Sequence, residues 1–176
     1  MGILSDVEGL RQRARKHLEA GAVTDEYNAD LPEVIEILNV LLASELMCTL
    51  RYKRHYYSAS GINADAVKKE FLEHAQEAAG HADRIAARIV ELNGQPDFNP
   101  EVLTGRSLSQ YTNARTLQEM IREDLVAERI AVEAYSEVVR WLGESDVTTR
   151  KLMADILMVE EQHAADMQKL LGKYGD

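Results

Sequence analysis

Five residues of this chain combine carboxylate and imidazole side chains at spacings that suit a metal site. Glu160 and His163 lie three residues apart in VEEQH, so a helix places both on one face. Two Glu–His pairs also have nearly equal separations, because His81 follows Glu45 by 36 residues and His163 follows Glu128 by 35. Mixed carboxylate and imidazole sets suit iron, manganese or zinc. The sequence therefore predicts a metal site that these five residues share.

The elements that must position these side chains are helices. Apolar residues at helical spacing predict a short N-terminal helix and four long ones, separated by segments with Gly, Pro, Ser and Asp. The expected helices are 3–20, 31–59, 63–93, 114–143 and 146–173. Short links make antiparallel hairpins of the second with the third and of the fourth with the fifth, while the long connection between the hairpins can cross the bundle. We expect one all-α domain over residues 1–176, a ferritin-like four-helix bundle with one long crossover and an extra N-terminal helix.

The two hairpins repeat one pattern. Their first helices carry stripes with the same 4-3-4-3-4 spacing, each interrupted by one Glu with a Tyr seven residues later. The stripes are Leu38, Leu42, Glu45, Thr49, Tyr52, Tyr56 and Ile121, Leu125, Glu128, Val132, Tyr135, Val139. A carboxylate on an apolar stripe is costly unless it is paired or binds a metal. A buried hydrogen-bonded network is the alternative explanation, but the matched registers on four helices favour a metal.

Composition and charge narrow the function classes. The formal charge of −10 argues against a nucleic-acid groove over the whole surface, because phosphate binding needs clustered Lys and Arg. The single basic cluster, RQRARKH at 11–17, is better explained as the solvated face of a packed helix than as a DNA-binding arm. No apolar run reaches the roughly 18 residues that a membrane span needs. The lone Cys48 and the lack of a signal-like start favour a cytoplasmic setting.

Several motifs resemble bacterioferritins. LNVLLASEL followed by Tyr52 and His55 resembles their first bundle helix, GHADRI their second, DLVAER their third and VEEQHAADM their fourth. The resemblance covers about residues 34–172. It implies an intrasubunit di-iron centre that oxidises Fe(II) with dioxygen or peroxide, in subunits that assemble into a hollow cage and store the ferric product.

The same resemblance assigns a role to each site residue. Glu45 and Glu128 match the terminal carboxylate ligands, His81 and His163 the imidazole ligands, and Glu160 a bridging carboxylate. Tyr52 matches a redox-capable neighbour of the irons, and is the one residue we expect to act in catalysis without binding metal.

Two departures from the bacterioferritin pattern limit what is carried over. Ala78 stands where the other bridging Glu is expected, so the di-iron site is predicted to be incomplete and its ferroxidase activity weakened. Glu77 is adjacent and could replace the missing ligand, although its direction on a helix differs by about 100°. Ala79 stands where bacterioferritins have the haem-binding Met, so no haem is expected by that route.

The sequence leaves alternatives for the number of subunits and for the function of the assembly. Only 13 residues follow His163 and about thirty precede the first bundle helix, a distribution that is more similar to the starvation-induced DNA-protecting (Dps) mini-ferritins. We therefore expect a homo-oligomer with twelve subunits in preference to twenty-four. The alternatives to iron storage are a Dps-like DNA-protecting or structural cage and another di-metal oxidase or peroxidase. Only one cysteine is present, which weighs against a rubrerythrin with its four-cysteine iron site.

Overall fold

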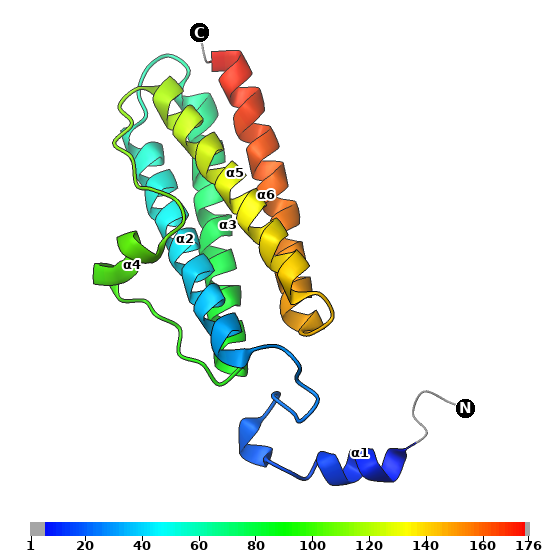
Figure 1. Ribbon diagram of the computed structural model, residues 1–176. Coiled ribbons are helices and arrows are strands. Elements are labelled where there is room, and N and C mark those ends of the chain that lie inside the picture. The colour runs from blue at the N-terminus through cyan, green and yellow to red at the C-terminus, as the bar shows by residue number, and fades with distance from the viewer. Residues whose placement is uncertain (1–5, 175–176) are drawn as a thin grey trace.

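Four long helices lie side by side in the structure, a computed structural model that describes residues 6–174 (Figure 1). They are α2 (Leu31–Ser58), α3 (Ala64–Glu91), α5 (Leu117–Leu142) and α6 (Val147–Tyr174), and the described residues contain no strand. The predicted all-α fold class is confirmed, and each long helix lies within three residues of its expected bounds. Within this described range, no helix combines the length and the apolar character that a membrane crossing needs.

The starts of the long helices follow from local chemistry. Before α2, the Asp30 side chain accepts a hydrogen bond from the backbone N–H of Glu33 at 3.1 Å, and a proline occupies the first turn. Before α5, Thr116 and Glu119 form a reciprocal capping box. At the end of α5, Gly143 adopts a positive φ of 48°, which a residue with a Cβ rarely adopts. These caps define the register in which each helix presents its inward stripe.

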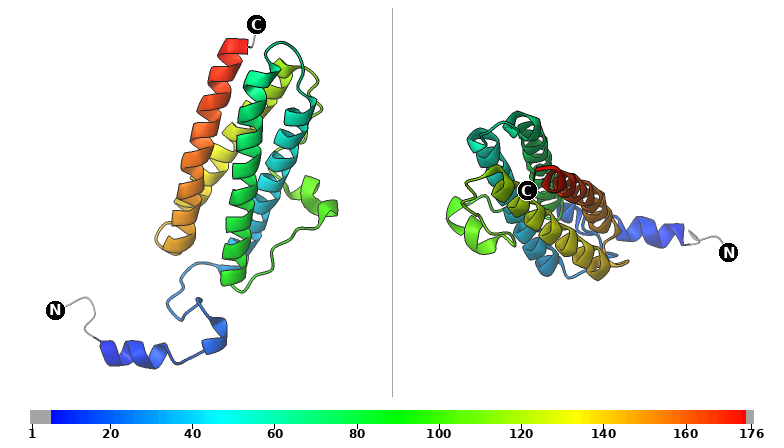
Figure 2. Two further views of the ribbon diagram at one scale, coloured as in Figure 1. Left: turned by 180° about the vertical axis from the view of Figure 1, so that it is seen from behind. Right: turned by 90° about the horizontal axis from the view of Figure 1, so that it is seen from above.

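The helices form two antiparallel hairpins joined by one long crossover. α2 packs chiefly on α3, and α5 chiefly on α6. The chain between α3 and α5 returns along the bundle, so that α3 and α5 run in the same direction (Figures 1 and 2). This is the arrangement that the link lengths predict.

The crossover contains a helix that the sequence analysis did not anticipate, α4 (Pro100–Arg106), packed outside α2 (Figure 1). The signal for it was present, because Asn99 caps the helix and Pro100 begins it. The crossover is tied to α2 through side chains: Asn39 accepts a hydrogen bond from the Asp97 N–H at 2.8 Å, and Ser44 accepts one from the Leu108 N–H at 3.0 Å.

The prediction of one helix over residues 3–20 is wrong over its described part. α1 (Val7–Arg13) ends early, and a 3₁₀ helix, η1 (Leu18–Ala20), follows a turn at His17 with a φ of 49°. Residues 3–5 lie outside the described residues. No α1 residue is buried, so the segment has no packed face to extend the helix. The neighbouring positive charges of the 11–17 cluster also repel one another within a helix.

The core has two apolar parts with a polar layer between them. One part is centred on Leu38, Leu42, Ile85 and Ile156, and the other on Phe71, Met120, Ile121 and Met167. Between them lie buried carboxylates and imidazoles together with a cluster of small side chains, Cys48, Ala78 and Ala127. This layer contains the predicted site residues.

Candidate metal centre

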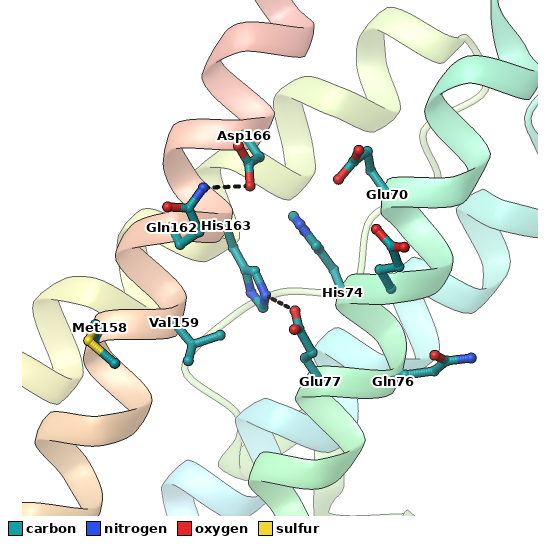
Figure 3. A pocket seen from close by; sticks show the side chains of 10 residues that line it. Glu70, His74, Gln76, Glu77, Met158, Val159, Gln162, His163 and Asp166 are labelled. Carbon is teal, nitrogen blue, oxygen red and sulfur yellow. Dashed lines mark hydrogen bonds and ion pairs between the residues drawn. The ribbon is translucent and has the colours of Figure 1, made fainter.

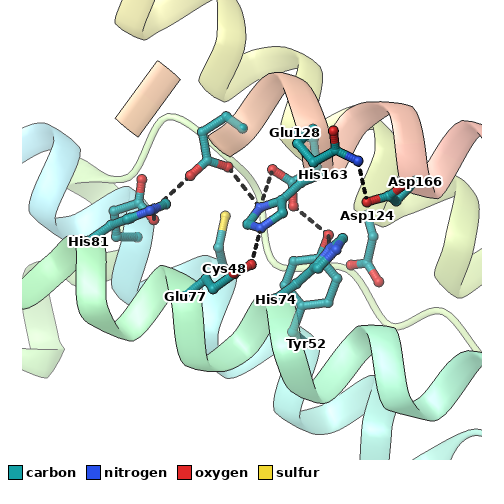
Figure 4. A network of polar contacts seen from close by, with 12 residues as sticks. Cys48, Tyr52, His74, Glu77, His81, Asp124, Glu128, His163 and Asp166 are labelled. Carbon is teal, nitrogen blue, oxygen red and sulfur yellow. Dashed lines mark hydrogen bonds and ion pairs between the residues drawn. The ribbon is translucent and has the colours of Figure 1, made fainter. Parts of the chain in front are cut away.

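The four long helices bring all five predicted ligands into one buried layer. Figure 4 labels three of these ligands, His81, Glu128 and His163. Glu45 comes from α2, His81 from α3, Glu128 from α5, and Glu160 and His163 from α6. None of them is more than 5% exposed. Charged side chains are almost never buried so completely without partners, so the layer requires an explanation from its own geometry.

Glu160 lies between the two histidines. Its Oε1 is 2.7 Å from Nδ1 of His81, and its Oε2 is 3.4 Å from Nδ1 of His163. Glu45 and Glu128 flank this centre, with Oε2 of Glu45 3.6 Å from Nδ1 of His81 and Oε2 of Glu128 3.9 Å from Nδ1 of His163. One carboxylate thus presents one oxygen to each imidazole, which is the geometry of a bridging ligand.

Two groups of potential ligands result. Glu45, His81 and Glu160 form the first, and His74, Glu128 and His163 form the second; within each group the ligand atoms lie within 4.8 Å of one another. Every member of both groups is buried. Glu160 joins the first group to the second through its contact with His163.

Unpaired polar atoms at the centre fit metal ions. Nδ1 of His81 and Oε1 of Glu160 are close, yet neither atom has an aligned hydrogen bond. Oε2 of Glu128 also has no hydrogen-bond partner. Buried polar atoms without partners are rare in native proteins and call for a specific reason. Carboxylate oxygens and imidazole nitrogens of this kind match the donor set of a hard or borderline metal ion.

Two tyrosines hold the outer carboxylates, and each comes from the opposite hairpin. Tyr52 on α2 donates a hydrogen bond to Oε1 of Glu128 on α5, and Tyr135 on α5 donates one to Oε1 of Glu45 on α2 at 2.5 Å. Each hairpin of the sequence repeat therefore supplies the tyrosine that binds the Glu of the other hairpin. Such hydrogen bonds orient ligands and leave their other oxygen free.

The charges of the metal-free layer are strongly coupled. Burial and the charge of Glu160 raise the pKa of Glu45 and of Glu128. Burial also raises the pKa of Glu160, but the close contacts of its carboxylate with His163 and His81 outweigh burial and hold that pKa below its usual value. Burial opposes the charged form of His81, yet Glu160 and Glu45 raise its pKa to about 9. Without metal, Glu160 is thus the carboxylate that keeps its charge, and protonated histidines compensate it.

The position opposite Glu160 has no carboxylate. Ala78 is 4% exposed and packs with Cys48 and Ala127. Glu77 does reach the layer, but its Oε2 lies 2.6 Å from Nε2 of His163, the ring nitrogen that points away from Glu160. Its side chain remains 53% exposed. Glu77 thus contacts a predicted ligand from outside and does not stand between the two histidines.

Two other buried histidines, His55 and His74, form hydrogen bonds with neighbouring side chains. Nδ1 of His55 is 2.8 Å from Oδ2 of Asp124, and Nδ1 of His74 is 3.1 Å from the Tyr52 hydroxyl. Burial and the nearby His163 lower the pKa of His74 to about 3, so its ring is neutral. Cys48 is buried and accepts a hydrogen bond from Arg51.

Sequence reasoning missed two supporting residues. Asp124 is fully buried and contacts both His55 and Arg51. Its position four residues before Glu128, on the same helical face, was a usable signal. The role of Tyr135 was also missed, although it follows Glu128 by the same seven residues that separate Tyr52 from Glu45.

Comparison with known proteins agrees with this architecture. Residues 35–175 match the family described as ferritin-like domain. The bacterioferritin of Rhodobacter capsulatus is 27% identical over 143 residues, covering 81% of this chain and 84% of that protein. The DNA protection during starvation protein of Pyrococcus furiosus is 28% identical over 148 residues, covering 81% of this chain and 78% of that protein.

A solved structure shows the same fold. The bacterioferritin-related protein of Bacteroides fragilis, a dodecameric thioferritin, superimposes with a TM-score of 0.80 at 29% identity, covering 84% of this chain and 89% of that one. These matches confirm the resemblance to bacterioferritins and Dps-like mini-ferritins that the motifs indicated.

Proposed function

Because this chain belongs to the ferritin-like family, we propose that it binds Fe(II) in the buried layer, oxidises it, and stores Fe(III) inside a hollow assembly of identical subunits. The observation that carries the proposal is the position of Glu160, whose two carboxylate oxygens each face one histidine. A single hydrogen-bonded pair does not require a carboxylate placed between two histidines. Two adjacent metal ions require a shared carboxylate, because it brings the ions close together and offsets their repulsion.

The ligand roles follow from the contacts. Glu45 and His81 would hold one Fe(II), Glu128 and His163 the other, and Glu160 both. Each Fe(II) gives up one electron, so that a pair reduces dioxygen to hydrogen peroxide with two protons, or peroxide to water. Carboxylates favour the product because Fe(III) is hard and prefers oxygen ligands. Deprotonation of the two histidines accompanies metal binding, since imidazole binds metal in its neutral form.

Tyr52 is the redox-capable side chain beside this centre. It is 1% exposed and hydrogen-bonded to both Glu128 and His74. Burial and the charge of Glu128 raise its pKa, so the phenol stays protonated and can release an electron together with its proton. This is the role we propose for Tyr52 when the oxidant requires more electrons than the two irons supply.

The missing carboxylate at Ala78 weakens the pair without removing it. Glu45, His81, Glu128, Glu160 and His163 still surround the centre, but only Glu160 can be shared. We expect the second Fe(II) to bind more weakly than the first, because the second ion must be accommodated with one bridging charge instead of two. Glu77 supports His163 and does not replace the bridge.

The assembly we propose has twelve subunits. The related thioferritin of Bacteroides fragilis is dodecameric. Large apolar side chains are exposed where α2 ends and the turn to α3 begins, with Tyr57 at 79% and Ile62 at 100%. Exposed apolar surface is typical of contacts between subunits.

A second candidate is a DNA-protecting cage in which iron oxidation is secondary. The observation that favours it is the exposed basic segment 11–17, which is not packed on the bundle as the sequence analysis expected. The relative from Pyrococcus furiosus is named for DNA protection. Salt-dependent retention of duplex DNA by the assembled protein, lost when the arginines of 11–17 are replaced, would support this function.

The test of the main proposal is oxygen-dependent oxidation of Fe(II) by the assembled protein. Glu160→Gln should slow oxidation by about a hundredfold or more. Loss of a residue that only hydrogen-bonds to a metal ligand already costs about 10–100-fold in metal affinity or activity. Glu161→Gln is the matched control, since Glu161 is the exposed neighbour on the same helix and should leave the rate unchanged. Oxidation no faster than that of Fe(II) in buffer would refute the proposal, and light scattering would establish the subunit number.

A further inference from the structure

A cavity of about 600 Å³ opens between α3 and α6, beside the buried layer (Figure 3). Four carboxylates line it, those of Glu70, Glu73, Glu77 and Asp166, and two imidazoles close its inner end, His74 and His163. Carboxylates exceed basic side chains on its walls, so the cavity attracts cations.

Three of these residues form a group separate from the five ligands of the metal pair. Glu70, His74 and Asp166 each offer an atom, and these atoms lie within 4.8 Å of one another. In Figure 3 the ring of His74 extends from α3 into the space between Glu70 and Asp166. Glu70 and Asp166 are half-buried, whereas His74 is 3% exposed.

The hydrogen bonds of His74 determine which nitrogen can bind a metal. The single hydroxyl proton of Tyr52 is donated to Glu128, so the Tyr52 oxygen accepts from Nδ1 of His74 at 3.1 Å. With Nδ1 as the donor to Tyr52, Nε2 is the ring nitrogen that is available to a metal ion. Metal-binding histidines are usually held in this way, with the other ring nitrogen donating to a neighbour.

Asp166 is also held in place. Its Oδ2 accepts a hydrogen bond from Gln162 and its Oδ1 accepts one from Lys169, both at 2.9 Å. Burial raises the pKa of Asp166, but the Gln162 hydrogen bond and Lys169 outweigh it and keep the carboxylate ionised. Each carboxylate oxygen retains a second lone pair for a metal.

We propose that Glu70, Nε2 of His74 and Asp166 bind a divalent transition-metal ion at a third position, from which Fe(II) passes to the buried pair. Two carboxylates and one imidazole suit Fe(II), Co(II) and Zn(II). His74 connects the two regions, because its ring stacks on that of His163 at 3.9 Å and its Nδ1 reaches Glu128 through Tyr52. The passage of Fe(II) rests on the proposed function, whereas binding of the ion does not.

The binding test uses Co(II) without oxygen on the assembled protein. The double variant Glu70→Gln and Asp166→Asn should bind one Co(II) fewer per subunit than the unaltered chain. Glu73→Gln is the control, because Glu73 lines the same cavity and lies 3.3 Å from Lys69 but is not in the three-residue group. Anomalous scattering from Co(II) in crystals would locate the ion. Equal Co(II) binding by the double variant and the unaltered chain would overturn the proposal.

Oxidation kinetics separate this inference from the function on which part of it rests. If Fe(II) passes through the third position, the double variant should oxidise Fe(II) about tenfold more slowly at low iron. This decrease is similar in size to the effect of removing a residue that hydrogen-bonds to a metal ligand. If Co(II) binding is lost but the oxidation rate is unchanged, passage through this position is wrong. If Co(II) binding is lost and no form of the chain oxidises Fe(II), the third site stands and the ferroxidase proposal fails.

Discussion

The α2–α3 hairpin and the α5–α6 hairpin are built alike and differ at one bridging position. Each contributes a Glu from its first helix, a His from its second, and a Tyr that holds the carboxylate of the other hairpin. On α6, Glu160 precedes His163 by one turn, whereas on α3 the matching position before His81 is Ala78. The arrangement that places the ligands is therefore duplicated, but the shared ligand is not.

The surroundings of Ala78 explain how the bundle accommodates this difference. Two other small side chains, those of Cys48 and Ala127, pack with Ala78 at this position. The carboxylate of α3 is displaced to Glu77, which meets His163 from the side of the open cavity. The contact between Glu77 and His163 thus lies where the buried layer meets the cavity between α3 and α6.

The largest expected effect comes from restoring the missing carboxylate. Ala78→Glu should raise the affinity for a second metal ion by about a hundredfold. A bridging ligand should affect metal affinity at least as strongly as a residue that only hydrogen-bonds to a ligand. Titration with Co(II) and the rate of Fe(II) oxidation measure it. Ala79→Glu places the same charge one residue away and should have little effect. An unchanged second affinity in Ala78→Glu would mean that the two hairpins are already equivalent.

The second prediction concerns pH and the metal-free protein. The pKa of His81 rises from about 6.5 in the unfolded chain to about 9 in the folded one. Protonated His81 therefore stabilises the folded state fully below pH 6.5, and this stabilisation is lost as pH rises through 9. The shift corresponds to about 3 kcal/mol. The raised pKa of Glu45 and Glu128 acts in the same direction. Urea unfolding of the metal-free protein should therefore show stability falling between pH 6.5 and 9.

Two further measurements sharpen this pH prediction. His81→Asn should flatten the dependence, because His81 is the histidine that lies between Glu45 and Glu160. With Zn(II) present, stabilisation by the metal should increase with pH, since binding releases the histidine protons. A metal-free stability that is constant over the same range would contradict the charge distribution described for the layer.

The third prediction compares the exchanged tyrosines. Tyr52→Phe and Tyr135→Phe each remove one hydrogen bond to a buried carboxylate and should each cost about 1 kcal/mol in stability. Tyr52→Phe should cost more than Tyr135→Phe, because it also removes the hydrogen bond with His74. Both should weaken Co(II) binding to a similar extent. Only Tyr52→Phe should also change the oxidation kinetics, because Tyr52 is the tyrosine with the proposed redox role. Equal kinetic losses in the two variants would limit Tyr52 to positioning Glu128.

The smallest effect is expected at Glu77. Glu77→Gln keeps a hydrogen bond to His163. Because solvent screens the charge of the Glu77 side chain, which is 53% exposed, Fe(II) oxidation should slow by no more than about fivefold. Glu73→Gln, an exposed change on the same helix, should leave the rate unchanged. A loss as large as that of Glu160→Gln would show that Glu77 replaces the missing bridge when metal is bound.

Much of the bundle was predictable because helical periodicity is a local property. The stripes around Glu45 and Glu128 identified which faces point inward, and the links identified the hairpins. The N-terminal helix was not predicted correctly, because an amphipathic pattern forms a stable helix only if its apolar face is buried, and that of α1 is not. The short helix α4 was missed although Asn99 and Pro100 signalled it.

By itself, the sequence determined the four long helices, their inward faces, the ligand types and the absence of a carboxylate at Ala78. Only the tertiary structure decided that Glu160 faces both histidines, that Tyr52 and Tyr135 serve opposite hairpins, and that Glu77 approaches His163 from outside. The physical reason is the separation along the chain of the residues that decide each property. Helical periodicity depends on residues within a few turns of one helix, whereas ligand geometry depends on distances between helices that are far apart in the chain.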